Sequence, residues 1–415
     1  GWLPALRAHV EQNRIDYVYP AHDDVVLALA EHTGDLGAGV VGSPLETCRI
    51  ARSKRATYSQ LRKELRKHDI TIGAYGSGAR PIIGYDEVLS GWATTGGGYD
   101  NVYQISTSGF GEVYVVDETT TSGTASGYFR AYSRRTSIQG VEDQIGSSYW
   151  TGNVLYVHAY DDTDLTGTPV KTLYGNTRGY KVDSNSGDMD LGAIRTNDQS
   201  YIKIQNVHAV NQGYGIGGMN TDNILVDDCR ISGTSTATWF GHQYLQTTAS
   251  HDITTQNCEV RFNGNGLHHW GTNNLVVKGN TLSDSWHQVG GEDRTLVSAI
   301  GGFSNVQIYD NDFSEGKNGI ELDVRAGKTA EDIYIHHNRF HGVMYRGIAA
   351  WGRGTFAGDI HFYHNILWLP TANFVDPMGG TITAPRALTL SAATNSSSEP
   401  FVVYNNTISA SWGLF

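Results

Sequence analysis

The sequence predicts an all-β chain wound as a parallel β-helix, preceded by a small N-terminal α/β fragment. Two observations predict the β-helix. A six-residue phrase recurs, made of two apolar residues separated by one residue of any kind, then polar residues, then Asn or Cys. A second short apolar segment, opened by glycine, follows several copies of this phrase at a near-constant distance. Both observations place strands and turns, and not helices, in each repeat.

The copies of the phrase are spaced as in a repeat protein. They cover residues 224–229, 253–258, 275–280, 306–311, 333–338, 360–365 and 401–406. Neighbouring copies start 29, 22, 31, 27, 27 and 41 residues apart, a spacing typical of stacked repeats. Apolar residues two apart indicate strands with one buried face. Because each unit is too short to close a sandwich, we expect the coils to stack with their strands in register.

The last position of the phrase and the following glycines support this stacking. The last position holds Cys229, Cys258, Asn280, Asn311, Asn338, Asn365 and Asn406. Asn side chains at a turn can hydrogen-bond to their equivalents along a stack. The second segments begin at Gly215, Gly266, Gly319 and Gly347. We expect glycine at these corners because a Cβ would be crowded or because φ must be positive.

Residues 69–415 resemble the right-handed parallel β-helix repeat proteins of the pectin-lyase-like superfamily. The resemblance rests on the repeated phrase and on residues 70–81, which are similar to the opening coil of many carbohydrate-active β-helix proteins. It implies a right-handed coil, an extracellular or cell-surface location and action on a polysaccharide. The final residues, 406–415, look like a coil in progress, so a truncated C-terminus is expected.

Residues 1–66 follow a different pattern, with helical segments expected at 3–10, 25–30 and 57–67 and extended ones at 15–19 and 40–41. Alternation of this kind predicts an α/β fragment. Residues 17–24 and 43–54 resemble the region before the nucleotide-binding part of carbamoyl-phosphate-synthase-like ATP-grasp enzymes, which implies a basic residue near Lys54 close to a nucleotide. No second lobe or late acidic magnesium ligands follow, so we expect no nucleotide chemistry. The alternative is an α/β piece that caps or precedes the solenoid.

Composition excludes several function classes. The net charge of −12 argues against nucleic acid as a partner, since phosphate binding needs a basic surface. No run of about 18 apolar residues is present, so no membrane span is expected. Three cysteines give neither a disulfide framework nor a paired metal site. No signal peptide is recognisable at the start of the sequence.

A candidate site follows from strand alternation. If Ile320, Leu322 and Val324 are buried, then Glu321, Asp323 and Arg325 point outward. The same alternation turns the following side chains of neighbouring coils to the same face: His268, Trp270, Trp351 and Arg353. The uneven spacing predicts insertions that wall a groove, and these contribute Tyr244 and His287.

These residue types suit carbohydrate chemistry. Carboxylates two apart on a strand have Cα atoms about 6.6–6.8 Å apart, within the range of carboxyl separations in glycosidases. Repulsion between them would let one remain protonated as a general acid. Trp270 and Trp351 offer flat platforms for sugar rings. Arg325, Arg353, His268 and His287 could hold substrate, or could supply the base and cation of a lyase.

Other interpretations of the same residues stay open. Glu321, Asp323 and Arg325 can instead form a solvated face with an internal ion pair, or ligate calcium, the one cofactor that the sequence leaves open. Tyr309, His336, Tyr363 and Tyr404 share an outward column and predict a surface stack of rings. Asp310, His337 and His364 could form a metal site, although a flat ladder rarely gives the tetrahedral geometry it needs.

The sequence therefore predicts a protein that cleaves glycosidic bonds of a polysaccharide, with a hydrolase favoured over a lyase. The alternative is a non-catalytic glycan-binding or adhesive module, in which the two tryptophans bind sugar without cutting it. The fold alone does not separate the two.

Overall fold

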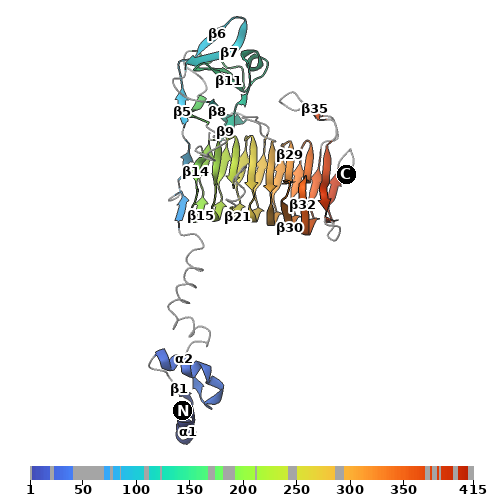
Figure 1. The fold of residues 1–415 in the computed structure, drawn as a ribbon. Helices are drawn as coiled ribbons and strands as arrows, with labels where there is room; N and C mark the ends of the chain where they lie inside the picture. Colours follow the sequence, from blue (N-terminus) through green and yellow to red (C-terminus); the bar gives the residue numbers. More distant parts are fainter. Residues whose placement is uncertain are drawn as a thin grey trace. The chain divides into compact units, whose positions relative to one another are not determined.

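We describe the protein from a computed structural model, shown in Figure 1. The structure describes residues 2–18, 23–40, 70–74, 78–84, 86–106, 112–121, 124–166, 173–180, 192–210, 213–241, 250–285, 294–369, 374–375, 381–382, 385–395 and 401–409. The chain divides into two compact units, residues 1–69 and 70–415.

The first unit is a small α/β fragment. It contains α1 (Trp2–Asn13), β1 (Tyr17–Val18), α2 (Asp23–Glu31), a 3-10 turn η1 (Thr33–Asp35) and β2 (Gly39–Val40). β1 and β2 pair in parallel. The helices and extended segments expected up to residue 41 are thus confirmed within the residues described, whereas the helix expected at 57–67 lies outside them.

The second unit is a parallel β-helix, as the sequence predicts. Its coils have three strand faces, whereas the sequence pattern predicts only two strands in each coil. Face A contains β14 (Gly192–Arg195), β17 (Tyr214–Gly218), β20 (Thr236–Phe240), β23 (Asn265–Trp270), β26 (Thr295–Gly301), β29 (Asn318–Val324), the start of β32 (Arg346–Tyr363) and β36 (Arg386–Asn395). Face B contains β3 (Ile70–Gly73), β15 (Ser200–Gln205), β18 (Asp222–Asp227), β21 (His251–Gln256), β24 (Asn273–Lys278), β27 (Phe303–Tyr309), β30 (Thr329–His336), the end of β32 and β37 (Val402–Tyr404).

Face C consists of very short strands that close each coil. They are β4 (Ile82–Ile83), β16 (His208–Val210), β19 (Arg230–Ser232), β22 (Glu259–Arg261), β25 (Thr281–Ser283), β28 (Asp312–Ser314), β31 (Arg339–His341), β33 (Ile366–Trp368) and β38 (Thr407–Ser409). All neighbours within the three faces pair in parallel, and Figure 1 shows the successive strands side by side along the stack.

A mainly antiparallel insertion, which the sequence pattern does not predict, interrupts the first coil between β4 and β14. One sheet contains β6 (Ala93–Gly96), β7 (Tyr99–Ser106), β10 (Ser133–Arg134), β11 (Ser147–Thr151) and β12 (Val154–His158), and the other contains β5 (Asp86–Leu89), β8 (Glu112–Thr121), β9 (Thr124–Ala131) and β13 (Leu173–Tyr180). A short helix, α5 (Ile138–Glu142), lies between β10 and β11. The insertion has its own core, which includes Trp92, Tyr132 and Leu155.

The insertion is attached to face C through its strand β9. The backbone N–H of Phe129 donates to Ser232 Oγ at 3.0 Å, and the Phe129 ring lies 5.7 Å from that of His208. The Arg130 guanidinium lies 5.0 Å from the Phe262 ring centroid. These contacts join the insertion to the three successive coils that contain β16, β19 and β22, since Phe262 directly follows β22. A short antiparallel pair, β34 (Phe374–Val375) with β35 (Thr381–Ile382), lies later in the chain.

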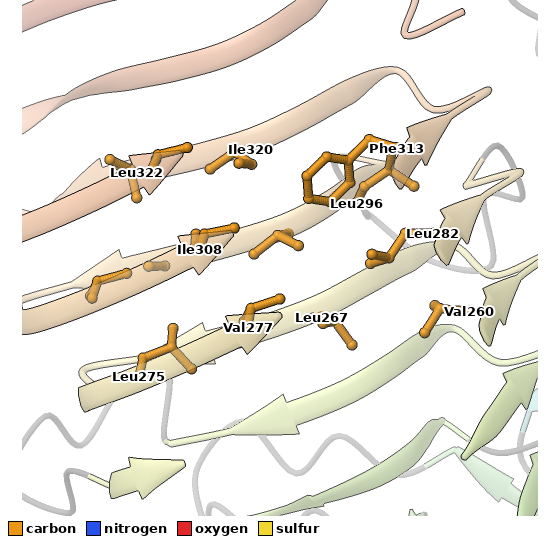
Figure 2. Close-up of a cluster of buried hydrophobic side chains, with 14 of the residues drawn as sticks. Val260, Leu267, Leu275, Val277, Leu282, Leu296, Ile308, Phe313, Ile320 and Leu322 are labelled. Atoms are coloured by element: carbon orange, nitrogen blue, oxygen red, sulfur yellow. The ribbon is translucent and has the colours of Figure 1, made fainter. Parts of the chain in front are cut away.

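The core of the β-helix is a continuous column of aliphatic and aromatic side chains. Ile320 and Leu322 are fully buried, and they stack on residues of equivalent position in the coils before and after. Figure 2 shows this packing for ten labelled side chains drawn from all three faces. The glycine before Ile320 is required by crowding, since a Cβ on Gly319 would lie 2.4 Å from the Gly347 carbonyl oxygen.

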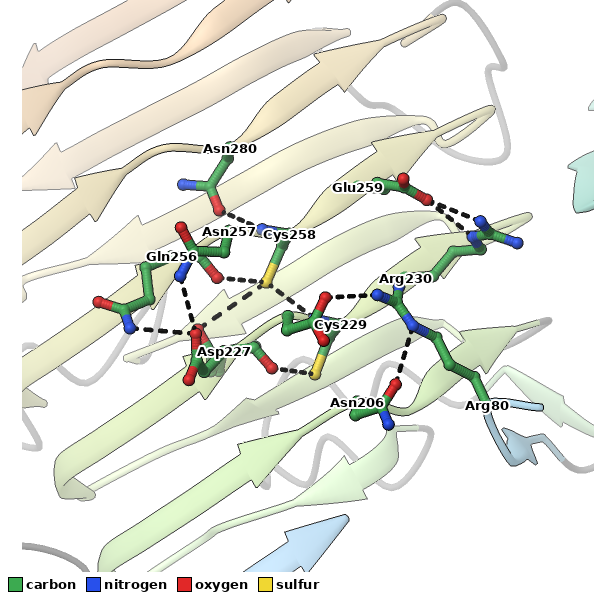
Figure 3. Close-up of polar contacts among 12 residues, drawn as sticks. Arg80, Asn206, Asp227, Cys229, Arg230, Gln256, Asn257, Cys258, Glu259 and Asn280 are labelled. Carbon is green, nitrogen blue, oxygen red and sulfur yellow. Dashed lines mark hydrogen bonds and ion pairs between the residues drawn. The ribbon is translucent and has the colours of Figure 1, made fainter. Parts of the chain in front are cut away.

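The amide ladder expected from the sequence is confirmed. Asn338 Nδ2 donates to Asn365 Oδ1 at 3.0 Å and to the Ile308 carbonyl at 2.8 Å, and the same pattern repeats at Asn280, Asn311 and Asn365. Cys258 and Cys229 continue the ladder, because the Cys258 N–H donates to Asn280 Oδ1 and the Cys229 N–H to Cys258 Sγ (Figure 3). Both thiols are buried and unbridged.

The column of rings on face B is also confirmed as a surface stack. Tyr309, His336, Tyr363 and Tyr404 follow one another at centroid distances of 4.9, 4.8 and 5.0 Å. Their planes are close to parallel, so the rings cover one another's faces. In the described residues, no group of three or more His, Cys, Asp or Glu side chains is arranged to hold a metal ion.

Candidate functional site

The candidate site lies on the outer side of face A, where strand register brings distant residues together. Trp239, His268, Ser298, Glu321 and Ala349 occupy one column on five successive coils. Trp270, Ile300, Asp323 and Trp351 occupy the next outward column. Alternation along each strand produces both columns, because the residues between them point into the core. We call the two columns, together with Thr295 and Arg325, the face A cluster.

Glu321 is held at the centre of the cluster by two donors. Thr295 Oγ1 donates to Glu321 Oε2 at 2.9 Å, and Trp351 Nε1 donates to Glu321 Oε1 at 3.0 Å. The glutamate is only 3% exposed. The alternative prediction of a solvated face is therefore wrong for Glu321. Large side chains on adjacent coils, such as Trp351, pack over it.

Asp323 and Arg325 form an internal ion pair, which is one of the alternatives that the sequence predicts. Asp323 Oδ2 lies 3.0 Å from Arg325 Nη2, and the aspartate side chain is 16% exposed. The Arg325 guanidinium also reaches back to Trp270, 5.4 Å from its ring centroid. Asp323 therefore stays closer to solvent than Glu321, although both belong to β29. Their oxygens face different partners, which allows the two carboxyl groups to have different roles.

His268 lies between two indoles. Its ring stacks on Trp239 at 4.8 Å between centroids and lies 5.6 Å from Trp270. His268 Nδ1 is 2.8 Å from Ser298 Oγ. Burial, with a smaller contribution from the charge of Arg325, lowers the pKa of His268 to about 3. The ring is therefore neutral at physiological pH.

The remaining predicted site residues differ in their placement. Trp351 is partly buried, and the guanidinium of Arg346 lies 4.5 Å from its ring centroid. Arg353 is exposed beyond the two columns. Tyr244 and His287 lie outside the described residues, so the expected groove walls remain predictions. A calcium site at Glu321 and Asp323 has no set of three acidic or imidazole ligands in the part of the chain described.

Sequence reasoning missed Ser298, Thr295 and Arg346. Thr295 and Ser298 belong to β26, which breaks the constant distance between the two strands of a coil. Its core residue Val297 lies 22 residues after Leu275, whereas in the preceding coil Leu267 lies only 14 residues after Ile253. The strand also lacks the leading glycine used to find the others. The signal available was the alternation of Val297, Ala299 and Gly301 with Ser298 and Ile300, which matches that of β29.

The fold and this face define the class of the second unit, a right-handed parallel β-helix. A family model described as a right handed beta helix region matches residues 192–367, from the start of β14 to β33. No curated protein sequence matches the chain. The ATP-grasp resemblance of residues 1–66 receives no support, because the matched range excludes them.

Two solved structures show some similarity to the chain. One is XylC in complex with xylose, with 9% identity and a TM-score of 0.34 over 72% of this chain and 60% of that chain. The other is the tailspike protein gp49 from Pseudomonas phage LKA1, with 13% identity and a TM-score of 0.27 over 83% of this chain and 68% of that one. The chain thus spans less than two thirds of the length of the first.

Proposed function

We propose that this chain is a carbohydrate-active β-helix protein that cleaves glycosidic bonds of a polysaccharide at the face A cluster. The observation that carries the proposal is the pair Glu321 and Asp323 on β29. One carboxyl is buried and held by two hydrogen bonds, while the other is more open and is paired with Arg325. Two carboxyls in unlike surroundings are what acid–base cleavage of a glycoside needs.

Each residue receives a role in the proposed hydrolysis. Glu321, oriented by Thr295 and Trp351, is the general acid that protonates the leaving oxygen. Asp323 acts on the opposite face of the sugar ring, either as a base that activates a water molecule or as the nucleophile. Arg325 and His268 hold the substrate, with Trp270, Trp351 and Arg353 along the sugar chain. Tyr244 and His287 remain substrate-binding candidates of this proposal.

A hydrolase is favoured over a lyase by the state of His268. A lyase removes a proton beside a carboxylate and needs a base whose pKa lies near the working pH. His268, with a pKa of about 3, is a weak base at neutral pH. Arg325 could neutralise a uronate, but its guanidinium is already paired with Asp323.

A second candidate function is glycan binding without cleavage. It is favoured by the partners of the two carboxyls, since both Glu321 oxygens accept hydrogen bonds and Asp323 forms an ion pair. Such satisfied groups also occur in purely structural networks. In either case the proposed partner is a polysaccharide, and the proposed location is extracellular or at a cell surface. The helices described in this structure include none that is long and apolar enough to cross a membrane.

The test measures new reducing ends released from a panel of neutral and acidic polysaccharides. Glu321→Gln and Asp323→Asn should each lower the rate by about 100-fold or more, with an unchanged circular dichroism spectrum. Glu331→Gln, which changes an exposed carboxylate on β30 of face B, is the matched control and should retain the rate. Unsaturated ends would indicate a lyase. Full activity in both site variants would refute the assignment, and glycan binding without new ends would support the second candidate.

A further inference from the structure

Three buried polar atoms in one corner of the face A cluster have no hydrogen-bond partner in the described part of the chain. They are His268 Nε2, Trp270 Nε1 and Arg325 Nε. The three side chains lie together, since the His268 and Trp270 rings are 5.6 Å apart and the Arg325 guanidinium is 5.4 Å from the Trp270 ring centroid. Leaving one buried polar group unpaired costs about 1–3 kcal/mol. Three such groups together indicate a place for a polar ligand.

The chemistry of these atoms defines the ligand. Trp270 Nε1 and Arg325 Nε carry hydrogen and can only donate. Two donors match the two lone pairs of a carbonyl oxygen, whereas a hydroxyl that accepted both would still have its own hydrogen to place. A carboxylate would add negative charge next to Asp323 and Glu321, and the charge of Arg325 is already balanced by Asp323 at 3.0 Å.

His268 completes the match. We assign the tautomer in which Nδ1 carries the hydrogen and donates to Ser298 Oγ at 2.8 Å, which leaves Nε2 as an acceptor. The low pKa of His268, caused first by burial, keeps the ring neutral over the physiological range. The corner therefore offers two donors and one acceptor, which is the complement of a secondary amide.

We propose that this corner is a subsite for the acylamido group of an N-acylated amino sugar. The sugar's amide carbonyl accepts from Trp270 Nε1 and Arg325 Nε, and its N–H donates to His268 Nε2. The acyl methyl group packs against the indoles of Trp239 and Trp270. This inference deepens the proposed function and rests on it, because it names the substrate class of the same face.

The experiment is isothermal titration of the full chain with tetrasaccharides. The probes are an N-acetylglucosamine tetramer, the unsubstituted glucose tetramer, an O-acetylated glucose tetramer and a galacturonate tetramer. We expect the N-acetylated probe to bind at least 10-fold tighter than the others. The O-acetylated probe tests the amide N–H, because it keeps the carbonyl and lacks that donor.

Trp270→Phe removes the N–H and keeps an aromatic face. It should weaken binding of the N-acetylated probe about 10-fold more than it weakens binding of the glucose tetramer, which has no acylamido group. Trp368→Phe is the matched control, because Trp368 is an exposed indole on β33 of face C, outside this corner, and the change should alter the affinity for neither probe. Arg325→Gln provides a second test if Trp270→Phe does not fold. Equal affinity for the N-acetylated and glucose tetramers, or tighter binding of galacturonate, would overturn the subsite and leave the proposed function intact. Binding of none of the probes, and of no polysaccharide in the panel, would overturn both.

Discussion

At the scale of single residues, the most unusual side chain in the core is His269. It points into the β-helix between Phe240 and Ala299 and is fully buried, with its ring stacked 5.8 Å from that of Phe240. Neither ring nitrogen has a partner among the residues described. Burial lowers the pKa of His269 to about 3, with a smaller contribution from His268. The neighbouring residue His268 shows the same pKa direction but has Ser298 as a partner.

Replacing His269 by Leu should therefore stabilise the protein. The change removes two unpaired buried nitrogens at similar volume, and we expect the free energy of unfolding to rise by about 1–2 kcal/mol. Urea unfolding followed by fluorescence measures the effect. His268→Leu is the comparison and should destabilise, since it leaves the Ser298 hydroxyl without its partner. A loss of stability in His269→Leu would show that its nitrogens are satisfied in solution.

At the scale of elements, the amide ladder connects the coils at the turn after face B. Each inner ladder amide accepts hydrogen bonds from the preceding coil through its oxygen, and its nitrogen donates both to a carbonyl of that coil and to the amide oxygen of the next coil. Asn338 Oδ1, for example, accepts from both the N–H and the Nδ2 of Asn311, and its own N–H donates to Asn365 Oδ1. Removing one amide thus leaves buried groups on two coils unpaired.

Asn338→Ala should lower the free energy of unfolding by about 3 kcal/mol, because several buried donors and acceptors lose their partners. Asn338→Cys is the matched variant, since Cys258 already fills this position in an earlier coil and its sulfur accepts from Cys229 N–H at 3.4 Å. We expect Cys to restore part of the loss. Chemical denaturation of the three proteins provides the measurement, and equal stability of the alanine variant and the unchanged chain would contradict the ladder's role.

How much could be predicted from sequence also differs between elements. The strands of faces A and B were predictable because Ile, Val and Leu alternate with polar residues and because asparagine or cysteine ends each phrase. The insertion of β5 to β13 was not, because most of its strand pairs are antiparallel and its strands carry no repeat. In the site, alternation placed Glu321, Asp323 and His268 on one face. It could not show that Trp351 covers Glu321 or that Arg325 reaches back to Trp270, because long side chains choose their partners across coils.

At the scale of the whole molecule, three buried histidines should make stability depend on pH. Burial, as the first cause in each case, lowers the pKa of His208, His268 and His269 to about 3. In the unfolded chain the pKa of histidine is about 6.5. Between pH 6.5 and 3 the unfolded state therefore binds more protons than the folded state, and stability falls as the pH is lowered.

We expect the urea midpoint to be constant from pH 8 to about 7 and to fall steadily below about 6.5. Each histidine contributes up to about 1.4 kcal/mol per pH unit in that range. The double variant His208→Gln, His269→Leu should show a shallower fall, which assigns the effect to these side chains and not to surface carboxylates. An unchanged midpoint between pH 7 and 5 would contradict the buried neutral state of the three rings.

The register of face A has one more consequence. Thr295, Ser298, Glu321 and Trp351 come from three consecutive windings, and each winding forms the same main-chain bonds to the next. If one complete winding between residues 294 and 318 were gained or lost, every remaining strand would still pair in parallel with a neighbour. The change would nevertheless bring new neighbours to the glutamate and the indoles. This architecture thus permits the side chains of the site to be changed by adding or removing whole windings, with no strand left unpaired.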